Sequence, residues 1–415
     1  MIKNFLLGFL LFYSITNLAQ EGTSSPYSFY GIGDIKFKGT VDTRAMGGVS
    51  VFPDSIHLNL QNPASYSTLK YIAFTIGGNY NTTRFKTNTE QENARRSAVD
   101  YIAIGIPIGR LGATFGLMPY SSVGYQINSI SSPSVARQFT GNGGVNKAFI
   151  GFAYQISKNF SVGADINFNF GSIRTESVVF SNQVLYGTKE RNNSSISGLN
   201  INTGVIYNRA LNKKVNLFSS LIFTPESSLK TLNSRNISTV QFSEGAGFIP
   251  TDAGIDVAVA NNNINLPSKI AAAFGLSENK KWGIGAEYTK QQFSSYSNRF
   301  VEITSGRFEN ANRYAIGGYI IPKYNSFSNY FERVNYRAGL RTENTGLIVN
   351  NKSITDTAIT MGLGLPLGGI LSNLNLTFEY GKRGTRAENL VEENYMNFLI
   401  SVSLTDKWFV KRKYD

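Results

Sequence analysis

Apolar and polar residues alternate strictly over residues 160–171, and this pattern constrains the fold more than any other feature of the chain. One face of that segment carries Phe160, Val162, Ala164, Ile166, Phe168 and Phe170, and the other carries only small or polar side chains. A period of two is typical of a β-strand with one apolar face. The same alternation returns at residues 282–289, 374–380 and 396–404. The sequence therefore predicts an all-β protein.

Residues 1–19 are predicted to be a secretory signal peptide. Lys3 precedes an apolar run over residues 5–12, and a more polar stretch then ends at Ala19. The run is too short and wrongly flanked for a spanning helix, and no later segment approaches the roughly 18 apolar residues that such a helix needs. We expect cleavage after Ala19, which leaves Gln20 as the first mature residue. The exported chain is then either soluble or a membrane barrel.

Composition and charge exclude several classes of exported protein. The 415 residues include 40 glycines, 11 prolines and no cysteine, which excludes a disulfide-stapled module, thiolate metal ligands and a cysteine nucleophile. The net charge of +13 could attract nucleic acid, but the basic residues are scattered and the densest cluster is residues 411–413. Anionic headgroups of outer-membrane lipids and a polar lumen explain the same charge. We expect no nucleic-acid partner.

About fourteen strands are predicted between residues 69 and 405. They lie near residues 69–85, 97–109, 111–127, 146–157, 159–177, 195–210, 214–229, 264–277, 281–297, 308–322, 333–348, 353–366, 372–382 and 394–405. Short polar connections such as residues 158–159 and 278–280 alternate with long ones, predicted at 128–145, 178–194 and 230–263. An even strand number, with short turns on one rim and long loops on the other, is typical of a transmembrane antiparallel β-barrel of the bacterial outer membrane. A soluble sandwich would have shorter strands.

Two segments lie outside this pattern. Residues 20–68 do not alternate, and their glycine pairs and Asn-Pro turn indicate a compact irregular segment with short helices. Residues 406–415 form a basic and aromatic tail, predicted to be periplasmic. Its candidate contacts for a partner protein are Trp408, Phe409, Lys411, Arg412 and Lys413.

Three blocks of sequence occur in an order that resembles a known family. The first reads Asp-Thr-Arg-Ala-Met-Gly-Gly-Val-Ser-Val over residues 42–51, and is followed by Asp54-Ser55 and Asn62-Pro63-Ala64. The second contains Asn265-Leu266-Pro267-Ser268-Lys269, Gly275, Lys281-Trp282 and Glu287-Tyr288, and the third is Tyr336-Arg337-Ala338-Gly339. Together they resemble the FadL/TodX family of outer-membrane transporters for hydrophobic compounds. The start at residues 24–31 is Bacteroidota-like and departs from that pattern.

The resemblance implies a fourteen-stranded barrel whose residues 20–68 fold inside the lumen as a hatch. It also implies that hydrophobic molecules such as long-chain fatty acids enter an apolar pocket and leave through a lateral opening at a kink in the third strand. That strand contains Met118 and Pro119, and proline cannot donate to a β-ladder. Pro119 is therefore the candidate kink, and a proline at a harmless rim position is the equally weighted alternative.

Structural roles are favoured for the candidate residues of the hatch. Arg44 could anchor the hatch to a carboxylate of the wall. Gly47 and Gly48 would permit close backbone approach or positive φ. Asn62 and Pro63 would form the turn that leads into the first strand.

Four charged residues are predicted to face the lumen because of their positions in alternating strands: Glu287, Arg313, Arg337 and Arg341. Inward arginines could hold the carboxylate of a fatty acid through paired hydrogen bonds. Barrels also fill their lumens with arginine–carboxylate networks that fix a hatch in place. The network is the favoured interpretation.

No enzyme activity, cofactor or metal is expected. His57 is the only histidine and lies in the predicted hatch, away from the barrel surface where a hydrolase would need it. The glycines at 362, 364 and 368 have the wrong spacing for a dinucleotide loop. No metal-ligand constellation is visible.

Two functions remain open. The first is a passive channel for hydrophobic compounds, with pocket binding and lateral release. The second is a non-transporting FadL-like barrel that serves as an accessory subunit of an outer-membrane protein secretion or barrel-assembly complex.

Overall fold

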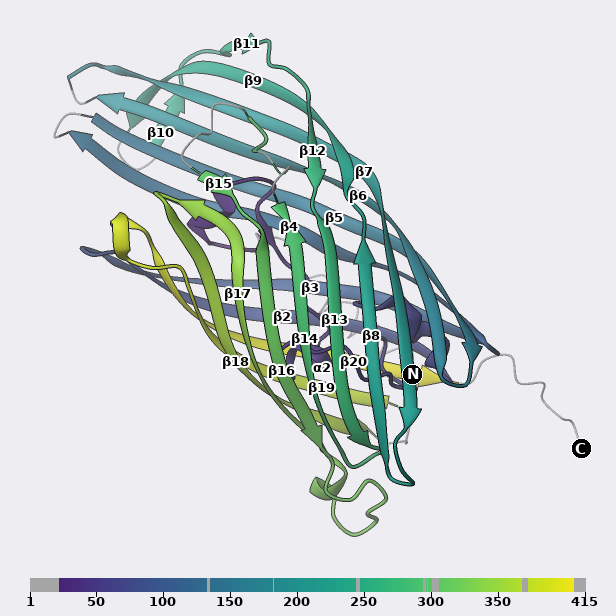
Figure 1. Cartoon of the computed structure of the whole chain (residues 1–415). Helices are drawn as coiled ribbons and strands as arrows, with labels where there is room; N and C mark the ends of the chain where they lie inside the picture. Colours follow the sequence, from purple (N-terminus) through teal and green to yellow (C-terminus); the bar gives the residue numbers. More distant parts are fainter. Residues whose placement is uncertain are drawn as a thin grey trace, which may run out of the picture.

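Each wall strand pairs with its neighbour in the sequence, and the last strand pairs with the first. The computed structural model describes residues 22–132, 135–181, 183–243, 247–293, 296, 298–300, 306–367 and 372–406. Strand β20 (Glu392–Asp406) pairs with both β19 (Ser372–Arg383) and β2 (Ile72–Lys86), which closes the sheet. The result is a closed antiparallel β-barrel of 14 strands (Figure 1), as the sequence predicts.

The remaining wall strands follow in chain order. They are β3 (Gln91–Ile108), β4 (Leu111–Ser132), β5 (Val135–Ser157), β6 (Phe160–Ser181), β7 (Tyr186–Ala210), β8 (Val215–Thr224) continued by β9 (Ser227–Ser243), β12 (Asn262–Leu266) continued by β13 (Ser268–Glu278), β14 (Trp282–Gln292), β16 (Ala311–Ile320), β17 (Asn335–Val349) and β18 (Lys352–Leu367). Short strands β10 (Gly247–Pro250) and β11 (Ile255–Val257) pair with β9, and β15 (Gly306–Phe308) pairs with β17.

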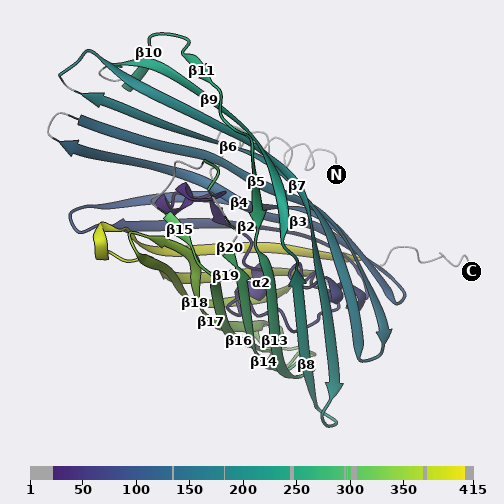
Figure 2. The ribbon, with the colours of Figure 1, turned by 45° about the horizontal axis from the view of Figure 1, so that its top comes forward.

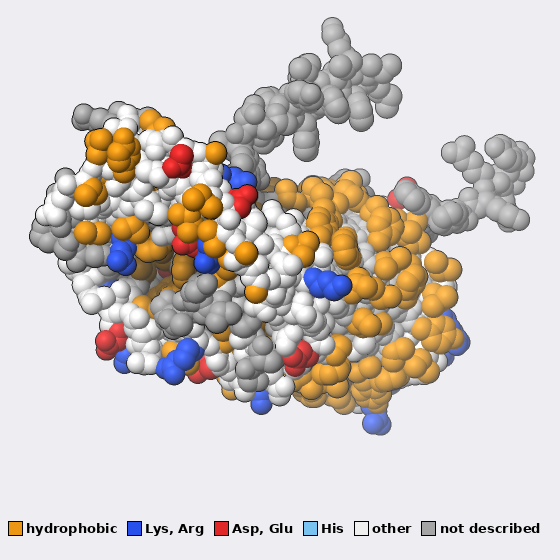
Figure 3. Space-filling model, turned by 90° about the horizontal axis from the view of Figure 1, so that it is seen from above, with side chains coloured by type: hydrophobic (Ala, Val, Ile, Leu, Met, Phe, Trp, Pro, Cys, Tyr) orange, Lys and Arg blue, Asp and Glu red, His pale blue; other side chains and the backbone are white. Residues whose placement is uncertain are grey.

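The outer surface carries the apolar residues of the alternating pattern. Exposed side chains include Phe115, Leu117, Ile150, Phe152, Ile166, Phe168, Ile284, Ile316, Ile359 and Phe398. Seen from above, apolar side chains cover one end of the barrel almost continuously, whereas the other end is mainly polar (Figure 3). This band is the lipid-facing surface of a membrane-spanning barrel.

Three connections predicted as long loops are mostly strand. In place of a loop at 128–145, β4 runs to Ser132 and β5 starts at Val135. In place of 178–194, β6 runs to Ser181 and β7 starts at Tyr186, and the range 230–263 contains most of β9 together with β10 and β11. These hairpins extend beyond the lipid band. Their outer face meets water in place of lipid and needs no apolar residues, although lumenal side chains such as Phe139 and Val240 remain apolar. The strict alternation therefore weakens while the hydrogen-bonded ladder continues.

Residues 22–68, here called the N-terminal segment, lie inside the barrel (Figure 2). The segment contains the 3₁₀ turn η1 (Pro26–Phe29), strand β1 (Asp34–Ile35), helix α2 (Val41–Arg44) and the 3₁₀ turn η2 (Pro63–Thr68). Two further 3₁₀ turns, η4 (Phe331–Arg333) and η5 (Ala387–Asn389), lie in connections of the wall.

An apolar core joins the N-terminal segment to the wall. Val41, Leu58 and Leu60 of the segment pack in one cluster with Tyr101, Met118 and other wall residues. A second cluster packs Ile32 against Val123, Ile173 and further side chains of the neighbouring strands. Within the described ranges, the structure contains no helix that is long and apolar enough to cross a membrane.

Candidate functional site

Buried ion pairs connect the N-terminal segment to the wall. Arg44 of α2 donates from Nη2 to Glu379 Oε2 of β19 at 2.6 Å, and its Nη1 lies 3.7 Å from Asp100 Oδ2 of β3. Glu379 is fully buried and also accepts from Arg341 of β17. Arg44 therefore anchors the N-terminal segment to a carboxylate of the wall. The second guanidinium group on that carboxylate, Arg341, belongs to the wall itself.

The same cluster extends to a second contact with the segment. Lys38 Nζ lies 2.5 Å from Glu343 Oε1 and 2.7 Å from Asp356 Oδ2. Arg341 Nη1 is 3.4 Å from Asp356 Oδ2, and the Tyr395 hydroxyl donates to Asp356 Oδ1 at 2.6 Å. Arg341 is thus engaged by wall carboxylates and does not line the main cavity described below. A signal for these partners is present in the sequence, because Asp356 and Glu379 occupy inward positions of their strands.

Gly47 and Gly48 lie where the segment touches the wall most closely. Their φ angles are +69° and +90°, which favour glycine. A Cβ atom on Gly47 would lie 2.6 Å from the Leu340 carbonyl oxygen, and one on Gly48 would lie 2.1 Å from Arg313 Nη2. The positive φ angle favours glycine at both positions, and at Gly47 the wall backbone also leaves no room for a Cβ atom.

Arg313 and Glu287 also face inward and contact the segment. Arg313 Nη2 donates to the Gly48 carbonyl oxygen at 3.1 Å and lies 4.0 Å from Glu287 Oε1. Glu287 Oε2 accepts from the backbone N–H and the hydroxyl of Ser50, at 2.9 and 2.7 Å. Arg337, the fourth predicted lumenal residue, is buried and donates to Asn375 Oδ1 at 2.9 Å.

Asn62 and Pro63 begin the turn η2 that leads toward the first wall strand. Asn62 Oδ1 accepts from the backbone N–H of Ala64 at 3.0 Å, and Pro63 occupies the first position of the turn, where no N–H is needed. Asn62 Nδ2 donates to the Val205 carbonyl oxygen at 3.2 Å. The turn therefore also ties the segment to β7.

His57 pairs with Asp54 within the segment, with Nδ1 and Oδ2 2.6 Å apart. Burial raises the pKa of Asp54, but the ion pair and hydrogen bond with His57 outweigh it and lower that pKa to about 2. Burial lowers the pKa of His57, and the same pair outweighs it, so the net shift is upward. No serine or second carboxylate joins them in a catalytic arrangement in the contacts of the described chain, and no group of three potential metal ligands occurs there.

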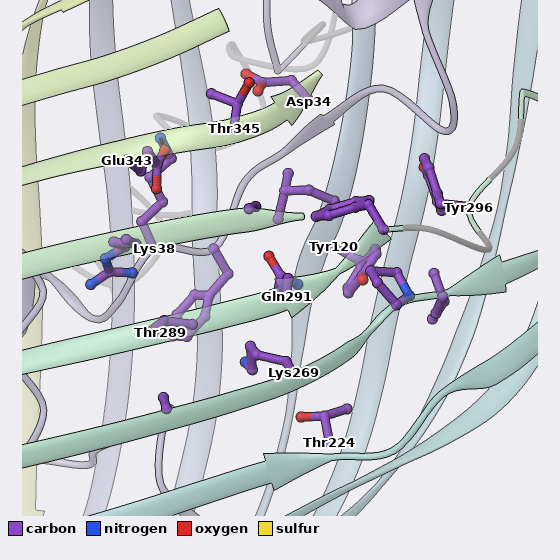
Figure 4. A pocket seen from close by; sticks show the side chains of 18 of the residues that line it. Asp34, Lys38, Tyr120, Thr224, Lys269, Thr289, Gln291, Tyr296, Glu343 and Thr345 are labelled. Carbon is purple, nitrogen blue, oxygen red and sulfur yellow. Dashed lines mark hydrogen bonds and ion pairs between the residues drawn. The ribbon is translucent and has the colours of Figure 1, made fainter. Parts of the chain in front are cut away.

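A cavity of about 230 Å³ lies between the N-terminal segment and the wall (Figure 4). Its lining is mixed. Aromatic side chains come from Tyr30, Phe37, Tyr120, Phe293, Tyr296 and Phe308, and charged ones from Asp34, Lys38, Lys147, Lys269, Glu287, Arg313, Glu343 and Arg383. Lys269, Thr289 and Gln291 project into it from neighbouring strands opposite Lys38 (Figure 4). Such a lining suits a molecule with an apolar body and a polar or acidic end.

The wall next to this cavity is incompletely paired. Strands β3 and β4 pair only from Ile102–Leu117 to Ile108–Leu111. Beyond these pairs, residues 91–101 of β3 pair with β2 alone among wall strands, and residues 118–132 of β4 pair with β5. Figure 1 shows the two strands diverging, with the N-terminal segment between them. We call this region the β3–β4 break.

Strand β1 of the N-terminal segment covers the part of the break that lies next to the last β3–β4 pair. Asp34 and Ile35 pair with Ser122 and Ser121, and the backbone N–H of Lys36 donates to the Tyr120 carbonyl oxygen at 3.0 Å. Strand addition of this kind from inside the lumen was not predicted from sequence. A two-residue strand has no detectable periodicity.

Met118 and Pro119, the predicted kink, lie at the start of the break. The register of β4 against β5 shifts between Pro119 and Ser121, which leaves Tyr120 as an extra residue. Met118 is buried, and Pro119 and Tyr120 line the cavity. The predicted tail contacts, from Trp408 to Lys413, lie outside the described residues, as does the predicted signal peptide.

These features define a class: a membrane-spanning barrel of 14 strands whose lumen is occupied by its own N-terminal segment. The model of the BamG family matches residues 1–415, and the chain belongs to that family. No curated protein matches the sequence.

Solved structures of similar fold include a toluene transporter, a FadL homologue and a monoaromatic hydrocarbon channel. The Pseudomonas putida toluene transporter TodX has a TM-score of 0.58 at 17% identity, over 91% of this chain and 100% of TodX. A Pseudomonas aeruginosa FadL homologue has a TM-score of 0.59 at 12% identity, over 91% and 100% of the two chains. The CymD monoaromatic hydrocarbon channel has a TM-score of 0.55 at 13% identity, over 91% and 99%. At these identities the likeness shows a shared fold.

Proposed function

We propose that this protein is an outer-membrane channel that binds hydrophobic or amphipathic compounds, such as long-chain fatty acids, and releases them sideways through the wall. The observation that carries this proposal is the β3–β4 break, where wall pairing stops after Ile102–Leu117. The cavity adjoins the break, since Pro119 and Tyr120 line it. The similar folds of TodX and the FadL homologue support the same function.

The physical driving force would be burial of apolar surface. A ligand that leaves water for the aromatic part of the cavity gains roughly 25 cal/mol for each Å² of apolar surface buried. Of the four charged residues predicted to face the lumen, Glu287 and Arg313 line this cavity. Arg313 would meet an acidic end group, whereas Arg341 is already paired with wall carboxylates. No energy source or cofactor is needed.

A disulfide lock tests the route. Ile35 and Ser121 are ladder partners across β1 and β4, and the native chain has no cysteine. The double substitution Ile35→Cys and Ser121→Cys would place the two Cα atoms within the range that a disulfide accepts. We expect oxidation to reduce uptake of labelled oleate by cells at least tenfold, and reduction to restore it.

A matched control uses a pair that needs no movement. Thr75 and Ser403 are partners in the closed β2–β20 ladder, with hydroxyl oxygens 3.3 Å apart. Oxidising Thr75→Cys with Ser403→Cys should leave uptake unchanged. Equal uptake by both oxidised proteins would show that release does not require β1 to leave β4.

A second function is favoured by the family name, which hints at membership of a complex. The buried ion pairs that hold the N-terminal segment also suit a rigid, non-transporting barrel used as an accessory subunit in protein secretion or barrel assembly. Gentle detergent extraction followed by native mass spectrometry distinguishes the channel function from the subunit function. A lone barrel carrying fatty-acid adducts supports the channel, and a stoichiometric protein partner that is lost when residues 407–415 are deleted supports the subunit.

A further inference from the structure

The outer part of β4 has a free edge that the N-terminal segment does not reach. The backbone N–H of Gly124 donates to Ser28 Oγ at 3.2 Å, and among the described residues this is the last hydrogen bond between the segment and the edge. The ring of Phe29 reaches one residue further and contacts the Tyr125 ring from the lumen. Strand β4 nevertheless continues to Ser132, paired with β5 on its other side. No further strand pairs with this edge in the part of the chain that the structure places.

The orientation of the backbone identifies the free groups. Tyr120, Ser122 and Gly124 direct backbone groups toward the N-terminal segment. Alternate residues of a strand present their N–H and C=O to the same edge. Gln126 and Asn128 are therefore the next residues whose backbone groups point away from β5, and their side chains are exposed.

The composition of this edge lacks the usual protection. Exposed edge strands in monomeric proteins carry lysine or proline, or are very short, because they otherwise act as templates for another chain. Residues 123–132 read Val-Gly-Tyr-Gln-Ile-Asn-Ser-Ile-Ser-Ser, without a charge or a proline. β-branched and aromatic residues make the segment favourable for strand pairing.

The edge lies in water on the outer side of the membrane. The last exposed apolar residue of β4 in the lipid band is Leu117, and at roughly 3.3 Å per residue Gln126 lies well beyond it. The opposite rim carries the short turns and the C-terminal end of β20, which is typical of the periplasmic side. A partner would therefore reach this edge from outside the cell.

We propose that the β4 edge from Gln126 to Ser132 binds an extended, uncharged segment of another protein by antiparallel strand addition. Main-chain hydrogen bonds would supply the affinity, as in other complexes formed at sheet edges. Antiparallel addition continues the ladder that β1 begins at Ser121 and Ser122. Apolar residues at alternate positions of the partner would pack beside Tyr125 and Ile127, whose side chains belong to the lumenal cluster.

A second copy of this chain does not fit the edge. All copies in one membrane have the same orientation, so every β4 runs outward. Antiparallel pairing requires strands of opposite direction, and two β4 strands cannot provide it in one membrane. The edge of β3 over residues 91–101 runs in the opposite direction, but it carries Glu92, Arg95 and Arg96, to which the uncharged β4 edge offers no counter-charge. An uncharged segment of a different protein is therefore the occupant that matches this edge in direction and in charge.

Site-specific photo-crosslinking tests this proposal. Benzoylphenylalanine would replace Gln126 or Asn128 in the full-length protein in its own cells, and mass spectrometry would map the attachment sites. We expect both probes to attach to one partner, with the Asn128 probe two residues N-terminal to the Gln126 probe on the partner chain. A probe at Ser172, exposed in the middle of the same sheet, should give no such adduct.

Two variants of the edge distinguish a partner that pairs with the β4 backbone from a protein that merely lies near the probe. Asn128→Pro removes one edge N–H, and Asn128→Ala keeps it. We expect the proline variant to lower the adduct yield from the Gln126 probe at least tenfold and the alanine variant to preserve it. Folding of each variant is verified by its heat-modifiable mobility on gels. Scattered attachment sites, attachment to this chain's own residues, absence of adducts, or equal yields from the two variants would each overturn the proposal.

Discussion

At the scale of single residues, the lumen is held together by buried charges that satisfy one another. Glu379 is the clearest case, because it is fully buried and lies between Arg44 of the N-terminal segment and Arg341 of the wall. A buried ion pair adds little net stability over an apolar pair, but removal of one partner leaves an uncompensated charge. The positions of such residues are therefore more sensitive to substitution than the lipid-facing surface.

Substitution Glu379→Gln should destabilise the barrel by about 3–5 kcal/mol, because two buried guanidinium groups lose their shared carboxylate. Urea unfolding in detergent, followed by the mobility of the folded barrel on gels, measures the change. Glu90→Gln, at an exposed site between β2 and β3, is the matched control and should change stability by less than about 0.5 kcal/mol. Equal stabilities of the two variants would contradict this assignment.

The Asp54–His57 pair should make stability depend on pH. The pKa of His57 is raised, so its contribution is complete below about pH 6.5 and is lost as pH rises through the folded-state value. The pKa of Asp54 is lowered to about 2, so its contribution is present above about pH 4 and is lost as pH falls toward 2.

Comparison of the native protein with His57→Gln tests this linkage. Because the Asp54 side chain is 42% exposed, solvent screens the pair, and we expect a difference of at most about 1 kcal/mol at pH 5. The difference should shrink as the pH is raised to 9. Unfolding midpoints at the two pH values measure it, and a difference that grows with pH would refute the assignment.

At the scale of elements, β4 decides how the wall opens. Up to Met118 its even-numbered residues face the lumen, and after the bulge at Tyr120 the odd-numbered residues Ser121, Val123 and Tyr125 do so. The bulge therefore reverses the phase of the strand, and β3 pairing ends next to it. Bulges bend a strand and increase its twist, which explains why the two strands separate here.

Deletion of Tyr120 should close part of the β3–β4 break. It removes the extra residue and returns lumenal residues to a regular two-residue period, so no side chain has to change face. We expect a folded barrel whose uptake of labelled oleate falls at least tenfold. Unchanged uptake, in a protein that keeps its heat-modifiable mobility, would argue against the bulge as the cause of lateral release.

At the scale of the whole molecule, the N-terminal segment lies in the lumen and is fixed to the wall. It contacts strands all around the barrel, including β3, β4, β7, β14 and β19. Apolar clusters and buried ion pairs join it to the lumenal face of the wall. We therefore expect the segment to keep water and ions from passing through the barrel.

Removal of residues 22–60 should convert the barrel into a conducting pore. In planar lipid bilayers we expect the native protein to show no steady conductance and the deletion variant to show stable channels. The Thr75→Cys and Ser403→Cys protein, oxidised, serves as a sealed reference with an altered wall. A deletion variant that inserts but does not conduct would show that wall side chains alone fill the lumen.

The structure agrees with the sequence prediction wherever one strand face met lipid. Alternation located all 14 wall strands and placed Glu287, Arg313, Arg337 and Arg341 on the inward side. It failed at residues 128–145, 178–194 and 230–263, because strands outside the lipid need no apolar face. The sequence did not identify the carboxylates that pair with Arg44 and Arg341. An odd or even position in a strand shows which face a residue lies on, but not which residue lies opposite it across the lumen.

The sequence by itself determined that this protein is a membrane barrel, because the side-chain period of two is a local property that lipid on one face enforces. Only the tertiary structure decided where the barrel is incomplete. The end of β3–β4 pairing at Ile102–Leu117, the cover that β1 provides and the free edge beyond Gly124 depend on which distant backbone groups meet. Backbone hydrogen-bonding groups are the same at almost every residue, so their pairing across the chain leaves no local mark in the sequence.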